Sequence, residues 1–149
     1  MQLREICTTD AVSCGRETTV LEAARLMRTT HAGDLVVVDD PADACVPVGM
    51  ITDRDIVIKV LGNGVDAGSV TVGDVMSTPI VIGRESEDQW EAVARMRAHG
   101  VRRLPVTSAD GRLVGIVALD DLLKLLAKES GALIEAVTRE QDREHRNVR

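Results

Sequence analysis

Two carboxylates stand at matching places in the chain, where an apolar run gives way to a helical pattern: Asp55 in GMITDRDI (49–56) and Asp121 in GIVALDDL (115–122). A carboxylate just inside a helix start can accept hydrogen bonds from both hydroxyls of a ribose, and charge-assisted bonds are about twice as strong as neutral ones. The same helix start offers unpaired N–H groups to a phosphate. Basic side chains near these motifs can supply formal positive charge: Arg54, Lys59, Arg102 and Arg103.

The pair Thr52 and Asp55 has a second interpretation that needs no ligand. A Thr followed three residues later by an acidic residue forms a capping box, in which each side chain bonds the other residue's backbone N–H. In the second motif Ala118 replaces the Thr, so the cap is lost while Asp121 is kept. Ligand contact and helix capping both stay open for Asp55.

The two motifs belong to an internal repeat, which must be found before elements are assigned. Residues 19–38 align with residues 88–107 at an offset of 69, and residues 48–61 align with residues 114–127 at an offset of 66. Each copy is predicted to run strand, helix, strand, strand, helix. Hydrophobic periodicity and the capping box at Thr19 predict these elements in the first copy: 11–14, 20–30, 35–38, 48–51 and 56–61, ended by Gly62. The equivalents in the second copy are 80–82, 89–99, 104–107, 113–117 and 119–128.

The copies are too small to stand alone. A unit of about 60 residues buries only about 60% of its extended-chain surface, so the two copies are predicted to share one core. The apolar segments that precede them, 1–7 and 70–75, are expected to pack onto their own copy. The predicted organisation is a first domain (1–62), a linker (63–73), a second domain (74–128) and a polar helix or tail (129–149).

This arrangement resembles a pair of CBS domains, a Bateman module, as found in small stand-alone bacterial proteins. The resemblance covers about residues 3 to 128 and rests on the two Gly-hydrophobic-hydrophobic-x-x-x-Asp motifs together with VRRLPV (101–106). It implies an α/β (α+β) fold in which two tandem repeats of β-α-β-β-α order pack into one pseudo-two-fold module. Two positions depart from the family pattern: Ala118 replaces the usual Thr or Ser, and Val36 stands where the second copy has Pro105.

The resemblance also implies a function. A non-enzymatic regulatory module would bind an adenine nucleotide, AMP or ATP, in clefts between the repeats and signal its ligand state to a regulated protein. The first implied site comprises Thr52 and Asp55 with Gly33, Asp34 and Leu35, and Arg54 supplies charge. The second comprises Asp121 with Arg102, Arg103, Leu104 and Pro105. The alternative is a ligand-free scaffold with vestigial clefts, which Ala118 and the acidity of the chain favour.

Composition excludes several other classes. The 149 residues carry a formal charge of −6, and Trp90 is the single aromatic residue, so the chain lacks both the charge and the stacking platforms for nucleic acid. Its ring is expected to pack at a helix start. The sequence contains no apolar run of membrane-spanning length, no P-loop, no catalytic triad and no metal-ligand spacing, so we expect a cytoplasmic protein without catalytic residues, metal or required cofactor. The three cysteines are expected to be reduced.

The predicted helices carry more aliphatic residues than one core-facing stripe needs. The excess lies in IVIKVL (56–61) and LLKLLA (122–127). A closed two-fold dimer would bury it, with the same patch used on both subunits. We therefore expect a homodimer.

Overall fold

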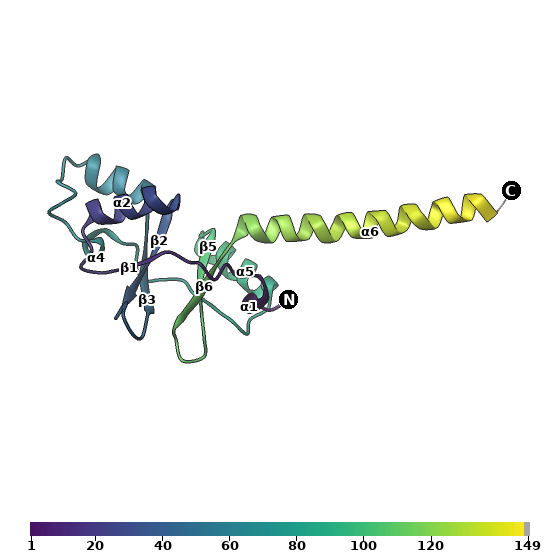
Figure 1. Cartoon of the computed structure of the whole chain (residues 1–149), viewed down its shortest axis with the longest axis horizontal. Coiled ribbons are helices and arrows are strands. Elements are labelled where there is room, and N and C mark those ends of the chain that lie inside the picture. The colour runs from purple at the N-terminus through teal and green to yellow at the C-terminus, as the bar shows by residue number, and fades with distance from the viewer. Residues whose placement is uncertain (148–149) are drawn as a thin grey trace.

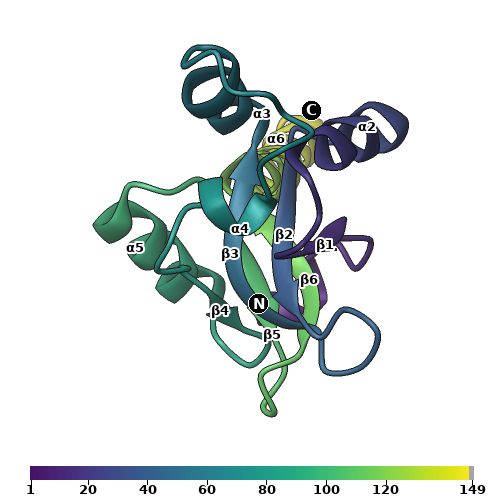
Figure 2. The ribbon, with the colours of Figure 1, turned by 90° about the vertical axis from the view of Figure 1, so that its left-hand side faces the viewer.

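The computed structural model describes residues 1–147, in which each copy of the repeat forms one three-stranded sheet with its own helices (Figure 1). In the first sheet, β1 (Ser13–Gly15) runs parallel to β2 (Asp34–Asp39), which pairs antiparallel with β3 (Val46–Thr52). In the second, β4 (Gly83–Arg84) is parallel to β5 (Arg103–Thr107), which pairs antiparallel with β6 (Leu113–Ala118). This confirms the predicted fold class and element order. The strands of both sheets lie in the middle of the molecule and helices α2 (Val20–Thr30) and α5 (Gln89–His99) outside them (Figure 2).

Helices α2 and α5 begin and end where the sequence predicts. The hydroxyl oxygen of Thr19 accepts a hydrogen bond from Glu22 N at 3.1 Å, and Asp88 caps α5 by accepting one from Trp90 N at 2.9 Å. Each helix ends at a residue in the left-handed conformation, His31 and Gly100. The Trp90 side chain is 56% exposed, so the expectation that its ring packs at the helix start is wrong: the core-facing positions of this turn belong to Gln89 and Ala92.

The helix after β3 differs from its counterpart in the second copy. A short α3 (Asp53–Asp55) leads into a π-helix, η1 (Ile56–Leu61), which closes with a bond from Gly62 N to Val57 O at 2.7 Å. The wider i→i+5 turn still buries Ile56 and Val60.

The segments preceding the two copies pack onto the opposite copy, which corrects the expectation. In α1 (Leu3–Ile6), Leu3 is buried in the core of the second sheet, and its N–H bonds Glu87 O at 2.9 Å. In α4 (Val72–Val75), Val72 is buried in the core of the first sheet and its N–H bonds Thr18 O at 2.7 Å. The two copies present equivalent apolar surfaces, so the apolar pattern alone does not distinguish them. The molecule accordingly has two cores joined by this exchange rather than the single shared core predicted.

The exchange explains the glycine of each repeated motif. Isolated bridges pair Thr8 with Ile116 and Ser77 with Met50, so the exchanged chain crosses directly over Gly115 and Gly49. A Cβ at Gly115 would lie 2.6 Å from Thr8 O, and one at Gly49 would lie 2.6 Å from the sulfur of Met76. A side chain at either position would therefore clash with the crossing segment.

The last helix, α6 (Leu119–Asn147), is continuous and projects from the folded body (Figure 1). The sequence analysis ends a helix at residue 128, and this end is wrong: the helix continues without a break into the predicted polar helix or tail. No proline interrupts residues 119–147, and Gly131 weakens a helix by only about 1 kcal/mol. Residues 148–149 of the predicted tail lie outside the described residues.

Candidate functional site

The candidate residues gather at one end of the two sheets, where β2 and β5 begin and where β3 and β6 end. The strand register places Asp34 opposite Thr52 in the first sheet and Arg103 opposite Ala118 in the second. Helices α3 and α6 start at these two places, so their N-terminal N–H groups point toward the same end of the module. Gly33 continues the pairing of β2 with β3 at this end, because its carbonyl accepts a hydrogen bond from Asp53 N at 2.9 Å.

An ion pair joins the two copies at this end. Arg103 Nε lies 2.8 Å from Asp34 Oδ2, and the Asp34 side chain is only 15% exposed. That oxygen is buried without a hydrogen bond, so Arg103 offers it charge but no aligned donor. Burial raises the pKa of Asp34; the nearby Arg103 lowers it in part, and Asp53 raises it further. This acid is therefore incompletely satisfied at the junction of the repeats, where a further donor would stabilise it.

The capping interpretation of Thr52 and Asp55 is confirmed. Asp55 N donates to Thr52 Oγ1 at 3.1 Å, and Thr52 N donates to Asp55 Oδ2 at 3.0 Å. The second oxygen of Asp55 lies 3.2 Å from Lys59 Nζ. Since a carboxylate offers about four lone-pair sites, these two contacts leave acceptor capacity at Asp55.

The second predicted set divides between two neighbourhoods. Arg102 Nη2 donates to Asp120 Oδ1 at 2.7 Å, an ion pair that the sequence analysis did not single out. Asp121 Oδ1 lies 3.6 Å from Lys124 Nζ. The same residue lines a cavity of about 270 Å³, together with Met1 and Glu5 of the exchanged N-terminal segment. Its place beside a segment more than a hundred residues away in the chain could not be read from local spacing.

The remaining candidate residues differ in whether their side chains are exposed to solvent. The side chains of three of them are buried, so only their backbone could reach a ligand: Leu35, Leu104 and Pro105. Arg54 is exposed, and among the side chains that the structure describes (residues 1–143 and 146) its guanidinium has no ion-pair partner. It is therefore available to an anion.

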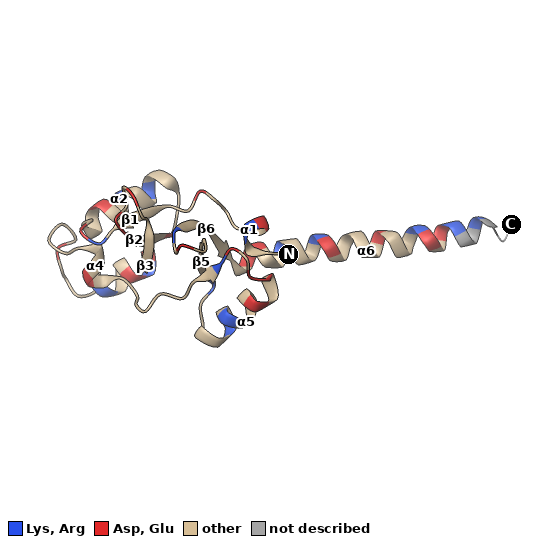
Figure 3. Ribbon diagram, turned by 90° about the horizontal axis from the view of Figure 1, so that it is seen from below, with Lys and Arg blue, Asp and Glu red and all other residues tan. Residues whose placement is uncertain are grey.

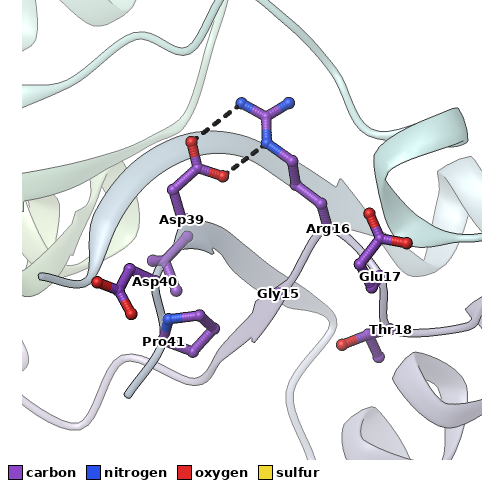
Figure 4. Close-up of a pocket in the computed structure, with 8 residues that line it drawn as sticks. Gly15, Arg16, Glu17, Thr18, Asp39, Asp40 and Pro41 are labelled. Atoms are coloured by element: carbon purple, nitrogen blue, oxygen red, sulfur yellow. Dashed lines mark hydrogen bonds and ion pairs between the residues drawn. The ribbon is translucent and has the colours of Figure 1, made fainter. Parts of the chain in front are cut away.

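A larger cavity of about 540 Å³ lies at the opposite end of the first sheet, between the turns that follow β1 and β2 (Figure 4). Arg16 and Asp39 face each other across it, with Nε to Oδ1 at 2.6 Å and Nη2 to Oδ2 at 3.3 Å. The hydrogen bond from Arg16 holds the pKa of Asp39 below its usual range. Neither residue belongs to a motif, and the strand register alone brings their turns together. Because Asp39 matches the charge of Arg16, the lining of this cavity offers no unpaired basic group to an anion; its other charged residues, Glu17 and Asp40, are acidic.

The described residues also bear on three other features: a metal site, a reactive cysteine and a membrane-spanning helix. Among the described side chains, residues 1–143 and 146, no three His, Cys, Asp or Glu residues cluster so that they could hold a metal, and all three cysteines are free. Burial raises the pKa of Cys14 to about 11, so its thiol is a poor nucleophile. Over the same residues, no helix combines the length and apolarity needed to cross a membrane.

The chain is similar in sequence and in fold to several known proteins. The chain is 36% identical over 121 residues to the uncharacterized protein MK0525 of Methanopyrus kandleri, covering 81% of this chain and 60% of that protein. It is 35% identical over 127 residues to Hypoxic response protein 1 of Mycobacterium tuberculosis, covering 85% of this chain and 86% of that one. A crystal structure of Hypoxic Response Protein I with two coordinated zinc ions matches with a TM-score of 0.74 and covers 83% of this chain and 98% of that one.

The cytosolic domain of the Mg²⁺ channel MgtE, solved in complex with ATP, matches with a TM-score of 0.68 and 28% identity. That match covers 80% of this chain and 46% of the other. The sequence model of the CBS domain matches here twice, over residues 3–62 and 72–128. With two such matches and the repeated β-α-β-β-α units, the chain belongs to the CBS domain family, as a tandem pair.

Proposed function

We propose that this CBS pair binds an adenine nucleotide at the junction of its two repeats and signals ligand occupancy to a regulated protein. The observation that carries the proposal is the contact between Asp34 and Arg103 beside two helix starts. Asp34 is a largely buried acid whose Oδ2 lacks a hydrogen bond, and Arg103 is a half-exposed base from the other repeat. A nucleotide supplies what this place lacks: hydroxyl and amino donors for the acids and phosphate oxygens for the bases.

The roles of the residues follow from their chemistry. Asp55 has free acceptor sites for ribose hydroxyls, and Asp121 is its counterpart in the second repeat. Arg54 and Arg103 can pair with phosphate oxygens, since guanidinium groups bind phosphate through two parallel bonds. The N–H groups at the start of α6 add a partial positive charge. The complex of the MgtE cytosolic domain with ATP supports an adenine nucleotide as the ligand class.

The proposed assembly is a homodimer formed through the outer faces of the helices. Exposed apolar side chains lie on η1, α5 and α6: Val57, Ile58, Leu61, Trp90 and Leu123. A closed two-fold dimer would bury these residues with the same patch used twice. Sedimentation at micromolar concentration should give a species of about 32 kDa, twice the 16.1 kDa chain, whereas a 16.1 kDa species with and without nucleotide would contradict it.

Calorimetric titration of the full chain with AMP, ADP, ATP and GTP tests the ligand class. We expect saturable binding of at least one adenine nucleotide and weaker binding of GTP. A nucleotide at 100 times its dissociation constant should also raise the free energy of unfolding by about 2.7 kcal/mol. No binding by any adenine nucleotide, in both measurements, would favour the ligand-free scaffold instead.

A further inference from the structure

Helix α6 extends far beyond the part that packs on the second sheet. Its 29 residues span about 43 Å at 1.5 Å per residue. Leu133, Ile134 and Val137 on its outer half are 70%, 66% and 54% exposed. Helices in proteins gain most of their stability by burying an apolar face, and none of these three apolar side chains is buried.

These apolar side chains form one face of the helix. At 3.6 residues per turn, spacings of three, four and seven residues return to the same side. The residues that share this side of α6 form what we call the α6 stripe: Leu126, Ser130, Leu133, Ile134 and Val137. Helix α6 runs outward from the folded body, so the stripe follows its projecting part (Figure 1).

The charges of α6 are sorted around this stripe. Both signs occur along the helix (Figure 3), but helical geometry places Glu129 and Glu140 at the border of the stripe. The basic residues lie on the other side of the helix: Lys124, Lys128, Arg139, Arg143 and Arg146. All seven of these side chains are exposed. The apolar stripe therefore has an acidic border and no basic residue beside it.

The acidic border indicates which kind of helix fits. A second α6 packed antiparallel over the exposed centre near Ile134 would bring Glu129 opposite Glu140 of the other copy, and like charges at such positions destabilise the pair. A basic amphipathic helix would instead match the border with opposite charge while covering the apolar residues.

We propose that the α6 stripe is a docking surface for a basic amphipathic helix of another protein. The inference rests on the proposed function in one respect: it identifies that other protein with the regulated partner. The docking itself depends on residues far along α6 from the candidate nucleotide site, so it can be tested apart from nucleotide binding.

The test uses the full chain and a fluorescein-labelled synthetic peptide with leucines at helical spacing on one face and lysine and arginine on the other. A second peptide carries glutamate in place of every basic residue. Fluorescence anisotropy should show the basic peptide binding at least about tenfold more tightly than the acidic one. The paired substitution Leu133→Gln and Val137→Gln should weaken the basic peptide more than about tenfold, because it removes the apolar contacts of an already exposed surface.

A matched pair of variants separates docking from the general acidity of the chain. Glu129→Gln with Glu140→Gln removes two charges at the border, and Glu135→Gln with Asp142→Asn removes two on the rest of the helix. We expect the first pair to weaken the basic peptide about three- to tenfold and the second less than about twofold.

The proposal would be overturned if both pairs of substitutions weakened binding of the basic peptide equally, or if the wild type bound both peptides with equal affinity. A chain that self-associates through the stripe, shown by sedimentation that Leu133→Gln abolishes, would identify a second copy as the occupant and also overturn it. Calorimetry with ATP on the same variants reports the nucleotide site separately, so failure of one proposal is distinguishable from failure of the other.

Discussion

Replacing Leu3 by alanine tests whether the N-terminal segment is part of the second core. Leu3 is fully buried there, and a Cβ added to Gly83 would lie 2.6 Å from Leu3 Cδ1. Removing a buried leucine side chain lowers the free energy of unfolding by about 2 to 5 kcal/mol. Adding a methyl group against it in Gly83→Ala overpacks the same place, at about 1 to 3 kcal/mol.

The double variant with Leu3→Ala and Gly83→Ala tests whether the two positions are in contact in the second core. With the leucine side chain gone, the methyl of Gly83→Ala fills part of the space, so the combined loss should be smaller than the sum by about 0.5 to 3 kcal/mol. Val20→Ala, in the core of the first sheet, is the matched control and should add to Gly83→Ala within about 0.5 kcal/mol.

Urea denaturation followed by circular dichroism gives the four free energies, and hydrogen exchange locates the effect. Leu3→Ala should reduce amide protection in β5 more than in β2. Additive losses for Leu3 and Gly83, with β2 rather than β5 losing protection, would refute the exchange of segments.

Three further predictions follow from the two cores and the candidate site. Gly115→Ala should lower the urea midpoint more than Gly49→Ala, because the atom that a Cβ would meet is the Thr8 backbone in one case and the flexible Met76 side chain in the other. Burial raises the pKa of Asp34 in the folded chain above its ordinary 3.8. Between pH 3.8 and that raised pKa, the folded chain therefore binds more protons than the unfolded chain. The free energy of unfolding of the wild type relative to Asp34→Asn should therefore fall as pH rises through that window, which urea titrations at a series of pH values check. Ala118→Ser restores a hydroxyl beside the start of α6 and should tighten nucleotide binding at the second site in calorimetry; unchanged affinity would mean that this site is unused.

Local rules predicted much of this fold from the sequence. The offset repeat, the capping boxes at Thr19 and Thr52 and the run Leu35–Val38 depend on neighbours within a few residues, so α2, β2 and the start of α3 could be placed closely. The paired Gly-to-Asp motifs also located both helix starts that border the candidate site.

Contacts between segments far apart in the chain could not be predicted from the sequence. The exchange of α1 and α4 depends on two equivalent surfaces between which an apolar segment cannot choose by pattern. The contact of Asp34 with Arg103 and the place of Asp121 beside the N-terminal segment depend on how the repeats dock. Trp90 is exposed because Gln89 and Ala92 take the inward positions of its turn, which a periodicity of apolar residues does not reveal.

The proposed nucleotide site depends most on the carboxylate of Asp55. Asp74 is the matched control for its substitution. Both are the acidic members of capping boxes, with Thr52 N to Asp55 Oδ2 at 3.0 Å and Thr71 N to Asp74 Oδ2 at 3.1 Å. Alanine at either position should lower the free energy of unfolding by about 1 kcal/mol.

The most direct measurement is calorimetric titration of both variants with the adenine nucleotide that binds the wild type most tightly. We predict that Asp55→Ala weakens binding by about 10- to 150-fold, the loss of about 1.5 to 3 kcal/mol for a hydrogen bond to a charged group, and that Asp74→Ala leaves the affinity within about twofold. Equal affinity for the two variants, with both destabilised alike, would show that Asp55 only caps its helix and would contradict the proposed site.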